Sequence, residues 1–121
     1  MKNICVIGSL NMDLVVNVDT MPKPGQTLLG GNFKEVPGGK GANQAVAMAR
    51  LDGRVSMIGK VGNDSFGKTL VKSLNDDNVN TDYIHEADCP SGVAFIPVDK
   101  NAQNTIVVAP GTNFELTKND I

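Results

Sequence analysis

The stretch VPGGKGANQAVAMARL, Val36 to Leu51, decides the fold expected for this chain. A glycine-rich loop stands directly before a run of alanine and other good helix formers. Alanine side chains let a helix approach a sheet closely, and glycines let the backbone of the loop approach a bound molecule. The stretch therefore predicts a loop–helix unit of an α/β fold, with a ligand beside the loop.

The loop fails both familiar phosphate-binding patterns. A P-loop reads G-x-x-x-x-G-K-[ST], but here Gly41 replaces the hydroxyl residue and Lys34 replaces the first glycine. A dinucleotide fingerprint needs a third glycine where this chain has Gln44. The residues around Lys40 thus point to a ligand other than a nucleotide phosphate.

The composition predicts one small soluble domain. The chain has 121 residues, 40% of them hydrophobic, and a formal net charge of -2, which argues against nucleic acid as the main partner. No apolar run approaches the roughly 18 residues that a membrane-spanning helix needs. Cys5 and Cys89 have no metal-like spacing and predict reduced thiols in the cytoplasm, with Cys5 packed in the core.

Hydrophobic periodicity predicts a parallel core. Buried strands are expected at residues 3–9, 54–62 and 81–86, with helices at 42–51 and 63–78 between them. In the second helix Asp64 or Ser65 is the expected N-cap, and the apolar stripe consists of Phe66, Leu70, Val71 and Leu74. Core strands joined by crossover helices predict a three-layer α/β/α sheet.

Amphipathic strands predict a separate small β-flap. They cover residues 12–19, 26–36, 92–99 and 104–111, so the flap is expected at approximately 12–35 and 92–109, with the remainder as α/β core. Pro97 predicts that its strand lies at an edge of the flap or ends there. Thr117 and Asp120 form an approximate capping box, a helix start just before the last residue. We therefore expect residues 1–121 to be the N-terminal portion of a longer protein.

With these elements placed, the sequence closely resembles the N-terminal part of the ribokinase-like sugar kinases, the PfkB family. The resemblance runs from Asn3 to the end, and its most specific segments are GSLNMDLV, PKPGQTLLG, PGGKGANQAVAMARL, GKVGNDSFG and PSGVAFIPVD. The family signature of a Gly-Gly loop, an Asn, a small residue and spaced glycines is matched by Gly38, Gly39, Asn43, Ala45 and Gly62. One departure is LDG, Leu51 to Gly53, where the family usually has Leu-Gly-Ala.

The resemblance implies an incomplete ribokinase-like core with a β-strand lid, and an ATP-dependent carbohydrate kinase. In such kinases the γ-phosphoryl group of ATP moves to a primary hydroxyl of a sugar held between core and lid. The family's sugar ligands map onto Asn11, Asp13, Gly38, Gly39, Lys40 and Asn43. The catalytic base and the sites for ATP, for Mg²⁺ and for a monovalent cation such as K⁺ are implied to lie outside these residues.

The resemblance favours D-ribose, converted to D-ribose 5-phosphate, over fructose, deoxyribose or a nucleoside. It also implies a homodimer formed through the lid and an inactive isolated 1–121 chain. Two alternatives stay open: another sugar or nucleoside kinase of the same family, or a non-catalytic sugar-binding or dimerisation module. Asn11 and Asp13 are also common turn formers, and Lys40 also suits a solvated loop.

Overall fold

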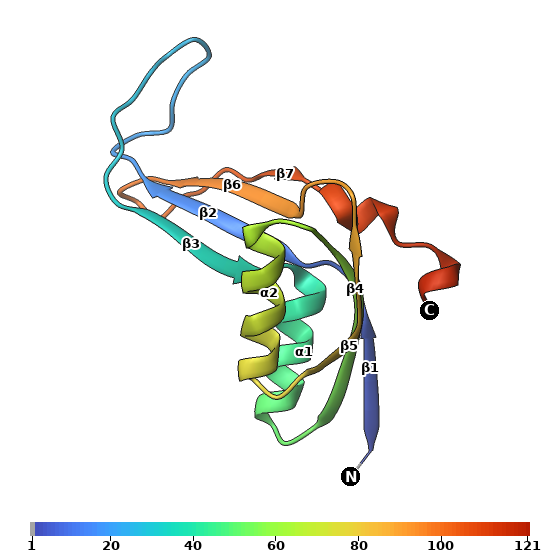
Figure 1. Ribbon diagram of the computed structural model, residues 1–121. Helices are drawn as coiled ribbons and strands as arrows, with labels where there is room; N and C mark the ends of the chain where they lie inside the picture. Colours follow the sequence, from blue (N-terminus) through green and yellow to red (C-terminus); the bar gives the residue numbers. More distant parts are fainter. Residues whose placement is uncertain (1) are drawn as a thin grey trace.

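The computed structural model describes residues 2–121 and contains two β-sheets, one of them covered by two α-helices (Figure 1). The core sheet is parallel and has the order β1-β4-β5, with β1 at Asn3–Ile7, β4 at Arg54–Gly62 and β5 at Asn80–Ala87. The second sheet has the order β3-β2-β6-β7, with β3 at Phe33–Gly38, β2 at Asn11–Asn17, β6 at Gly92–Val98 and β7 at Val107–Ala109. The helices are α1 (Lys40–Arg50), α2 (Ser65–Asp76) and the short 3₁₀ turns η1 (Gly111–Glu115) and η2 (Lys118–Asp120). The expected α/β class is confirmed.

The core lies between β4 and the two α-helices. Alternate residues of β4, among them Met57 and Val61, point toward the helices and are almost fully buried. Leu70 and Leu74 of α2 meet them from the other side, while Phe66 and Val71 pack at the margin of the same cluster, so the expected apolar stripe is confirmed. Ala45, which is completely buried, brings α1 close to the sheet.

Asp64 is the N-cap of α2. Its backbone is extended, and its carboxylate accepts a 2.8 Å hydrogen bond from the Gly67 N–H. This contact satisfies one of the backbone donors that every helix leaves free in its first turn. Of the two caps that the sequence allowed, the structure has Asp64.

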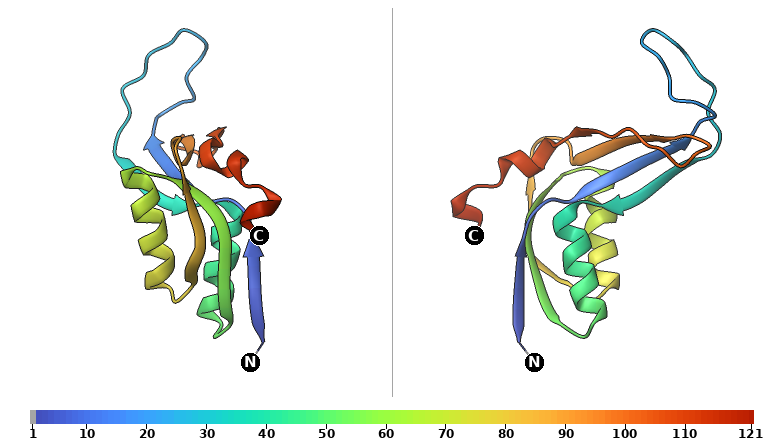
Figure 2. Two further views of the ribbon diagram at one scale, coloured as in Figure 1. Left: turned by 45° about the vertical axis from the view of Figure 1, so that its right-hand side comes forward. Right: turned by 180° about the vertical axis from the view of Figure 1, so that it is seen from behind.

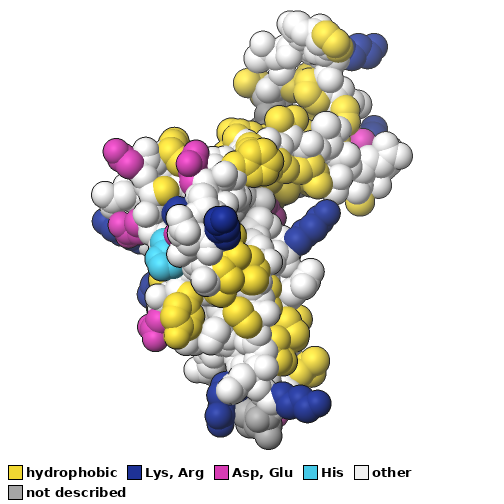
Figure 3. Space-filling view, turned by 90° about the vertical axis from the view of Figure 1, so that its right-hand side faces the viewer, with side chains coloured by type: hydrophobic (Ala, Val, Ile, Leu, Met, Phe, Trp, Pro, Cys, Tyr) yellow, Lys and Arg dark blue, Asp and Glu magenta, His cyan; other side chains and the backbone are white. Residues whose placement is uncertain are grey.

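The far face of the core sheet is open. Both α-helices lie on one face, so residues 2–121 form two of the three expected layers (Figure 2). The opposite face carries a cavity of about 990 Å³ whose lining includes Cys5, Ile58 and Tyr83. Hydrophobic side chains gather on this side of the molecule (Figure 3). The expectation that Cys5 is buried is wrong, because β1 turns Val6 toward the helices and therefore turns Cys5 outward.

Two strands of the second sheet are shorter than expected. The strand expected at residues 26–36 begins only at Phe33, and residues 18–32 instead form a loop that projects away from both sheets (Figure 1). The Gly31 N–H closes this loop with a 2.7 Å bond to the Asn17 carbonyl, so the chain leaves and re-enters the sheet at one place. The strand expected at 104–111 shrinks to Val107–Ala109.

Pro97 does not lie in an edge strand. Strand β6 is bordered by β2 on one side and β7 on the other, so the expected edge position is wrong, although the strand does end one residue later. The Pro97 carbonyl accepts a 3.3 Å bond from the Thr105 N–H. The nitrogen and the carbonyl of a strand residue point to the same side, so the nitrogen of Pro97 faces the segment just before β7. The N–H that proline lacks therefore removes no hydrogen bond between β6 and β2.

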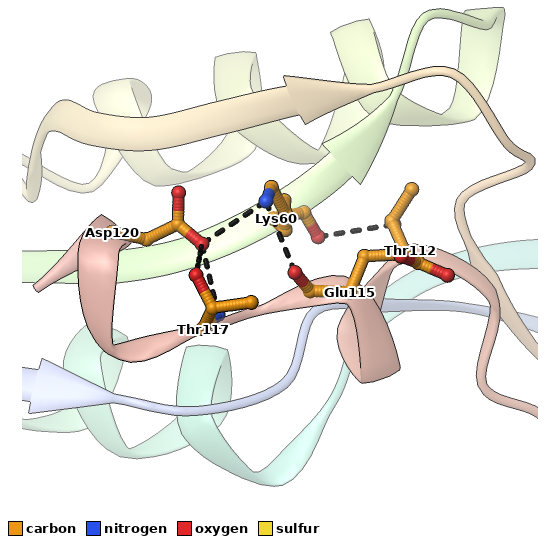
Figure 4. A network of polar contacts seen from close by, with 5 residues as sticks. All are labelled: Lys60, Thr112, Glu115, Thr117 and Asp120. Atoms are coloured by element: carbon orange, nitrogen blue, oxygen red, sulfur yellow. Dashed lines mark hydrogen bonds and ion pairs between the residues drawn. The ribbon is translucent and has the colours of Figure 1, made fainter.

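The capping box at Thr117 and Asp120 is confirmed, and it opens the 3₁₀ turn η2. Lys60 of β4 ties this terminal segment to the core (Figure 4). Its Nζ donates to the Glu115 carbonyl and to Asp120 Oδ2, both at 3.0 Å, while Thr112 Oγ1 donates to the Lys60 carbonyl at 3.2 Å. The hydrogen bond from the Thr117 N–H and the contact with Lys60 lower the pKa of the Asp120 carboxyl.

Candidate functional site

The candidate residues lie where the second sheet joins the carboxyl ends of the core strands (Figure 1). The chain passes from β1 through residues 8–10 directly into β2, and from β5 through residues 88–91 into β6. In open parallel sheets, ligands bind at this carboxyl end. The arrangement therefore brings the loop before α1 to the position where a ligand site is expected.

Asn11 stands between two glycines at the root of the second sheet. In the strand register it lies opposite Gly38 of β3 on one side and Gly92 of β6 on the other. Neither neighbour has a side chain, so the space above these two glycines is available to other polar side chains: the amides of Asn11 and Asn113 lie over Gly92, and the Asp13 carboxylate lies over Gly38. A Cβ at Gly92 would collide with Asn11 Oδ1, which shows that this glycine is needed for the amide to lie where it does.

Gly39 forms the tightest part of the loop. Its φ of 97° lies in the left-handed region, and an added Cβ would lie 2.6 Å from the Ser9 carbonyl oxygen. The Ala42 N–H in the first turn of α1 donates to the same oxygen at 3.0 Å. Glycine is therefore required here both by conformation and by space, and the loop backbone lies directly on the segment that leads into Asn11.

Asp13 is a half-buried carboxylate beside Gly38. A Cβ at Gly38 would lie 2.6 Å from Asp13 Oδ2, so the carboxylate occupies the space above this glycine. Across the sheet Asp13 lies opposite Val36 and Ala94, and Ala94 lies opposite Val108. Burial raises the pKa of the Asp13 carboxyl above its ordinary value.

Asn113 holds Asn11 from the other end of the chain. Its Nδ2 donates to Asn11 Oδ1 at 2.8 Å, to the Leu10 carbonyl at 3.0 Å and to the Pro110 carbonyl at 3.0 Å. Its Oδ1 accepts from the Leu10 N–H at 2.9 Å. Sequence reasoning missed this residue, because no local pattern links it to a partner more than one hundred positions away.

Lys40 and Asn43 lie on the first turn of α1. Lys40 is the first residue of the helix and its side chain is exposed. Asn43 is also exposed, and it lines a small cavity of about 30 Å³ together with Gly38 and Pro37. The structure thus brings Asn11, Asp13, Gly38 and Gly39 into direct proximity, and Lys40 and Asn43 follow on the first turn of α1, where Asn43 also faces Ser73 and Leu74 of α2 across the small cavity.

The described part of the chain contains neither a cluster of metal-ligating side chains nor a helix suited to cross a membrane. Among residues 2–121, no three His, Cys, Asp or Glu side chains lie together as metal ligands would. Within the same residues, no helix combines the length and apolarity needed to cross a membrane.

The sequence matches a family of known proteins along its whole length. Residues 1–121 match the family described as pfkB family carbohydrate kinase. The chain belongs to the pfkB family. Its glycine loop and the Asn11–Asp13 strand are therefore parts of a carbohydrate kinase fold, and the resemblance seen in the sequence is confirmed.

Curated relatives and solved structures agree with this membership. A ribokinase of Bacillus subtilis (strain 168) is 52% identical over 118 residues, which cover 97% of this chain and 40% of that protein. A deoxyribokinase of Salmonella typhimurium (strain LT2) is 44% identical, covering 98% of this chain and 39% of that protein. The structure of an Arabidopsis thaliana ribokinase complexed with ribose and ATP is similar with a TM-score of 0.82 and 34% identity, over 91% of this chain and 36% of that one. The chain thus spans about two fifths of the length of the curated relatives it matches.

Proposed function

We propose that residues 1–121 form the sugar-binding part of an ATP-dependent pfkB family kinase whose substrate is D-ribose. The observation that carries the proposal is the Asp13 carboxylate, which is half-buried and lies against Gly38 of the glycine loop. A partly desolvated acceptor is stabilised when ligand hydroxyls donate to it. The similarity to a ribokinase at 52% identity supports ribose as that ligand.

In this proposal the residues divide the recognition of one sugar. Asp13 accepts hydrogen bonds from two neighbouring hydroxyls, and the apolar row of Val36, Ala94 and Val108 beside it contacts the carbon skeleton. Gly38 and Gly39 let backbone N–H groups come within hydrogen-bond distance of further hydroxyls. Lys40 and Asn43 close the rim with a cation and an amide. The second sheet, as the lid, covers the sugar and excludes water.

The proposed reaction forms a bond between the primary hydroxyl oxygen of ribose and the γ-phosphorus of ATP. The bond between the γ-phosphorus and the β–γ bridging oxygen breaks, ADP leaves, and the hydroxyl proton goes to a base. Positioning and charge stabilisation provide most of the acceleration in phosphoryl transfer. Residues 1–121 contribute the positioning of the acceptor hydroxyl. The base, the nucleotide and any Mg²⁺ or K⁺ are held by residues outside this stretch. We therefore expect the isolated 1–121 chain to be inactive, and the complete gene product to work in the cytoplasm, where ATP is available and free thiols such as Cys5 and Cys89 persist.

The proposal is tested by ADP release from the complete gene product with ribose, deoxyribose, fructose and a nucleoside. Asp13→Ala should lower kcat/KM for ribose at least about tenfold, since each hydrogen bond to a charged acceptor contributes about 1.5–3 kcal/mol. The matched control is Asp82→Ala, an exposed carboxylate on β5 that should leave the kinetics unchanged. Equal kinetics for Asp13→Ala and wild type would remove Asp13 from the site. Faster turnover of deoxyribose, fructose or a nucleoside would show that ribose is not the preferred substrate. Sugar binding without turnover would favour the non-catalytic module.

We also propose a homodimer through the lid. Phe33, Phe95 and Val107 lie on the face of the second sheet opposite Asp13, and they are 59%, 49% and 61% exposed. A small sheet that leaves such a face in water gains stability when a second copy covers it. Light scattering of the complete gene product should give a dimer, and Phe95→Asp should give monomers. Leu29→Asp, at a 98% exposed position on the projecting loop, is the control. A wild-type monomer at high concentration would refute the dimer.

A further inference from the structure

The orientation of the Asn113 side-chain amide is determined by backbone groups. The Leu10 N–H can only donate, so the atom 2.9 Å from it must be the amide oxygen of Asn113. The carbonyl oxygens of Leu10 and Pro110 can only accept, so the atom 3.0 Å from each must be Nδ2. Three backbone groups thus agree on one orientation, and the reversed amide would lose all of these bonds.

This orientation determines that of Asn11 in turn. Because Asn113 Nδ2 donates, the atom of Asn11 that faces it at 2.8 Å must be the acceptor Oδ1. The remaining end of the Asn11 amide is its NH₂ group, a pure donor. On the same face of β2, two residues further along, stands the Asp13 carboxylate, which is a pure acceptor when ionised.

We propose that Asn113 is a positioning residue that makes Asn11 a hydrogen-bond donor to the substrate. Asn11 then donates to a ligand oxygen while Asp13 accepts from a neighbouring hydroxyl, and the pair recognises two adjacent oxygens of opposite hydrogen-bonding role. The inference rests on the proposed sugar site and deepens it, because it assigns to Asn113 a role that acts through Asn11. A ligand that carries an ammonium group in place of the oxygen facing Asn11 would set one donor against another, so we expect it not to bind.

The decisive variant is Asn113→Asp, which keeps the shape of the side chain and replaces the donor by a carboxylate oxygen. The new oxygen should accept from Asn11 where Asn113 Nδ2 donated, so the Asn11 amide should turn its NH₂ group toward residue 113 and its oxygen toward the ligand. We expect the KM of the complete gene product for ribose to rise about tenfold, with a smaller change in kcat. In an Asn11→Ala background the same substitution should have almost no further effect on KM, because residues that act through one contact are not additive.

Thr112→Val separates positioning from structure. Thr112 is the neighbouring residue of η1, is fully buried, and donates to the Lys60 carbonyl. Its replacement should lower the unfolding temperature and leave the KM for ribose unchanged. Asn113→Asp effects on KM that persist at full size in the Asn11→Ala background would overturn the proposal.

A readout without activity completes the test. The side-chain NH₂ resonances of Asn11, assigned by their loss in Asn11→Ala, should shift in Asn113→Asp and stay in place in Thr112→Val. Unmoved Asn11 resonances in a folded Asn113→Asp protein would also overturn the inference. A wild-type protein that phosphorylates no sugar would refute the proposed function instead, and the resonances would still decide whether Asn113 orients Asn11.

Discussion

The hydroxyl of Ser91 donates a 2.7 Å hydrogen bond to Asp64 Oδ1, although the two residues are 27 positions apart. The Ser91 N–H donates to Asp64 Oδ2 at 2.9 Å, and the Gly62 N–H donates to the Ser91 hydroxyl at 2.8 Å. Asp64 thus caps α2 and at the same time holds the residue that precedes β6. The helix start and the root of the second sheet share one carboxylate.

Asp64→Ala should therefore destabilise the folded protein in two ways, because it removes both the cap of α2 and the hydrogen bonds from Ser91. Desolvation raises the pKa of the Asp64 carboxyl, but the hydrogen bonds from Ser91 and Gly67 outweigh it and the pKa is lowered. A lowered folded-state pKa means stability that is present above the ordinary value of 3.8 and lost as the pH falls below it. Urea titration at pH 7 should show a loss of about 1–2 kcal/mol that shrinks toward pH 3. Asp76→Ala, on the exposed end of α2, should cost less than about 0.5 kcal/mol.

Gly39→Ala tests the close approach of the loop. Gly39 and Gly25 both have positive φ, 97° and 79°, but only at Gly39 does an added Cβ meet backbone atoms. Gly25→Ala should cost about 1 kcal/mol of unfolding free energy, which is the conformational penalty alone. Gly39→Ala should cost about 3 kcal/mol, since strain and collision add. Equal losses in denaturant titrations would mean that the loop has room to move.

Asp13→Asn should stabilise the ligand-free protein and weaken its binding. The raised pKa of Asp13 means that its charged form is disfavoured by folding, a cost that is complete above the raised value and absent below 3.8. The amide carries no such cost, so the unfolding temperature at pH 7 should rise and the two proteins should converge as the pH falls toward 3.8. Ribose should protect the wild type against heat and leave the variant almost unprotected. A variant that is less stable than wild type at pH 7 would contradict the assignment.

Lys60→Met should release the C-terminal segment without unfolding the core. The Lys60 side chain is 15% exposed and is held by Asp120 and by the Glu115 carbonyl (Figure 4). Amide hydrogen exchange at Asp120 and Ile121 should become about tenfold faster, whereas α2 and β4 should keep their protection. Lys72→Met removes an exposed ion pair with Asp76 and should change neither region. Unchanged exchange at Asp120 would show that other contacts hold the segment.

Local patterns were sufficient for the order of the elements. Three features depend only on residues close together in the sequence, and all are present in the structure: the strand at 54–62, the helical stripe of Leu70 and Leu74, and the N-cap at Asp64. The glycine loop was also readable, because a backbone conformation such as that of Gly39, with a φ of 97°, strongly favours glycine. The boundaries of β3 and β7 could not be predicted from the sequence, because the length of each strand depends on which neighbouring strands pair with it.

The sequence alone determined the α/β order, the capped helix and the residue types of the candidate site. Only the tertiary structure decided that Cys5 faces outward, that Ser91 shares the Asp64 carboxylate and that Asn113 orients Asn11. The reason is physical. Periodicity and capping are short-range properties of the backbone, whereas the direction of an amide depends on a donor that folding brings from 102 residues away.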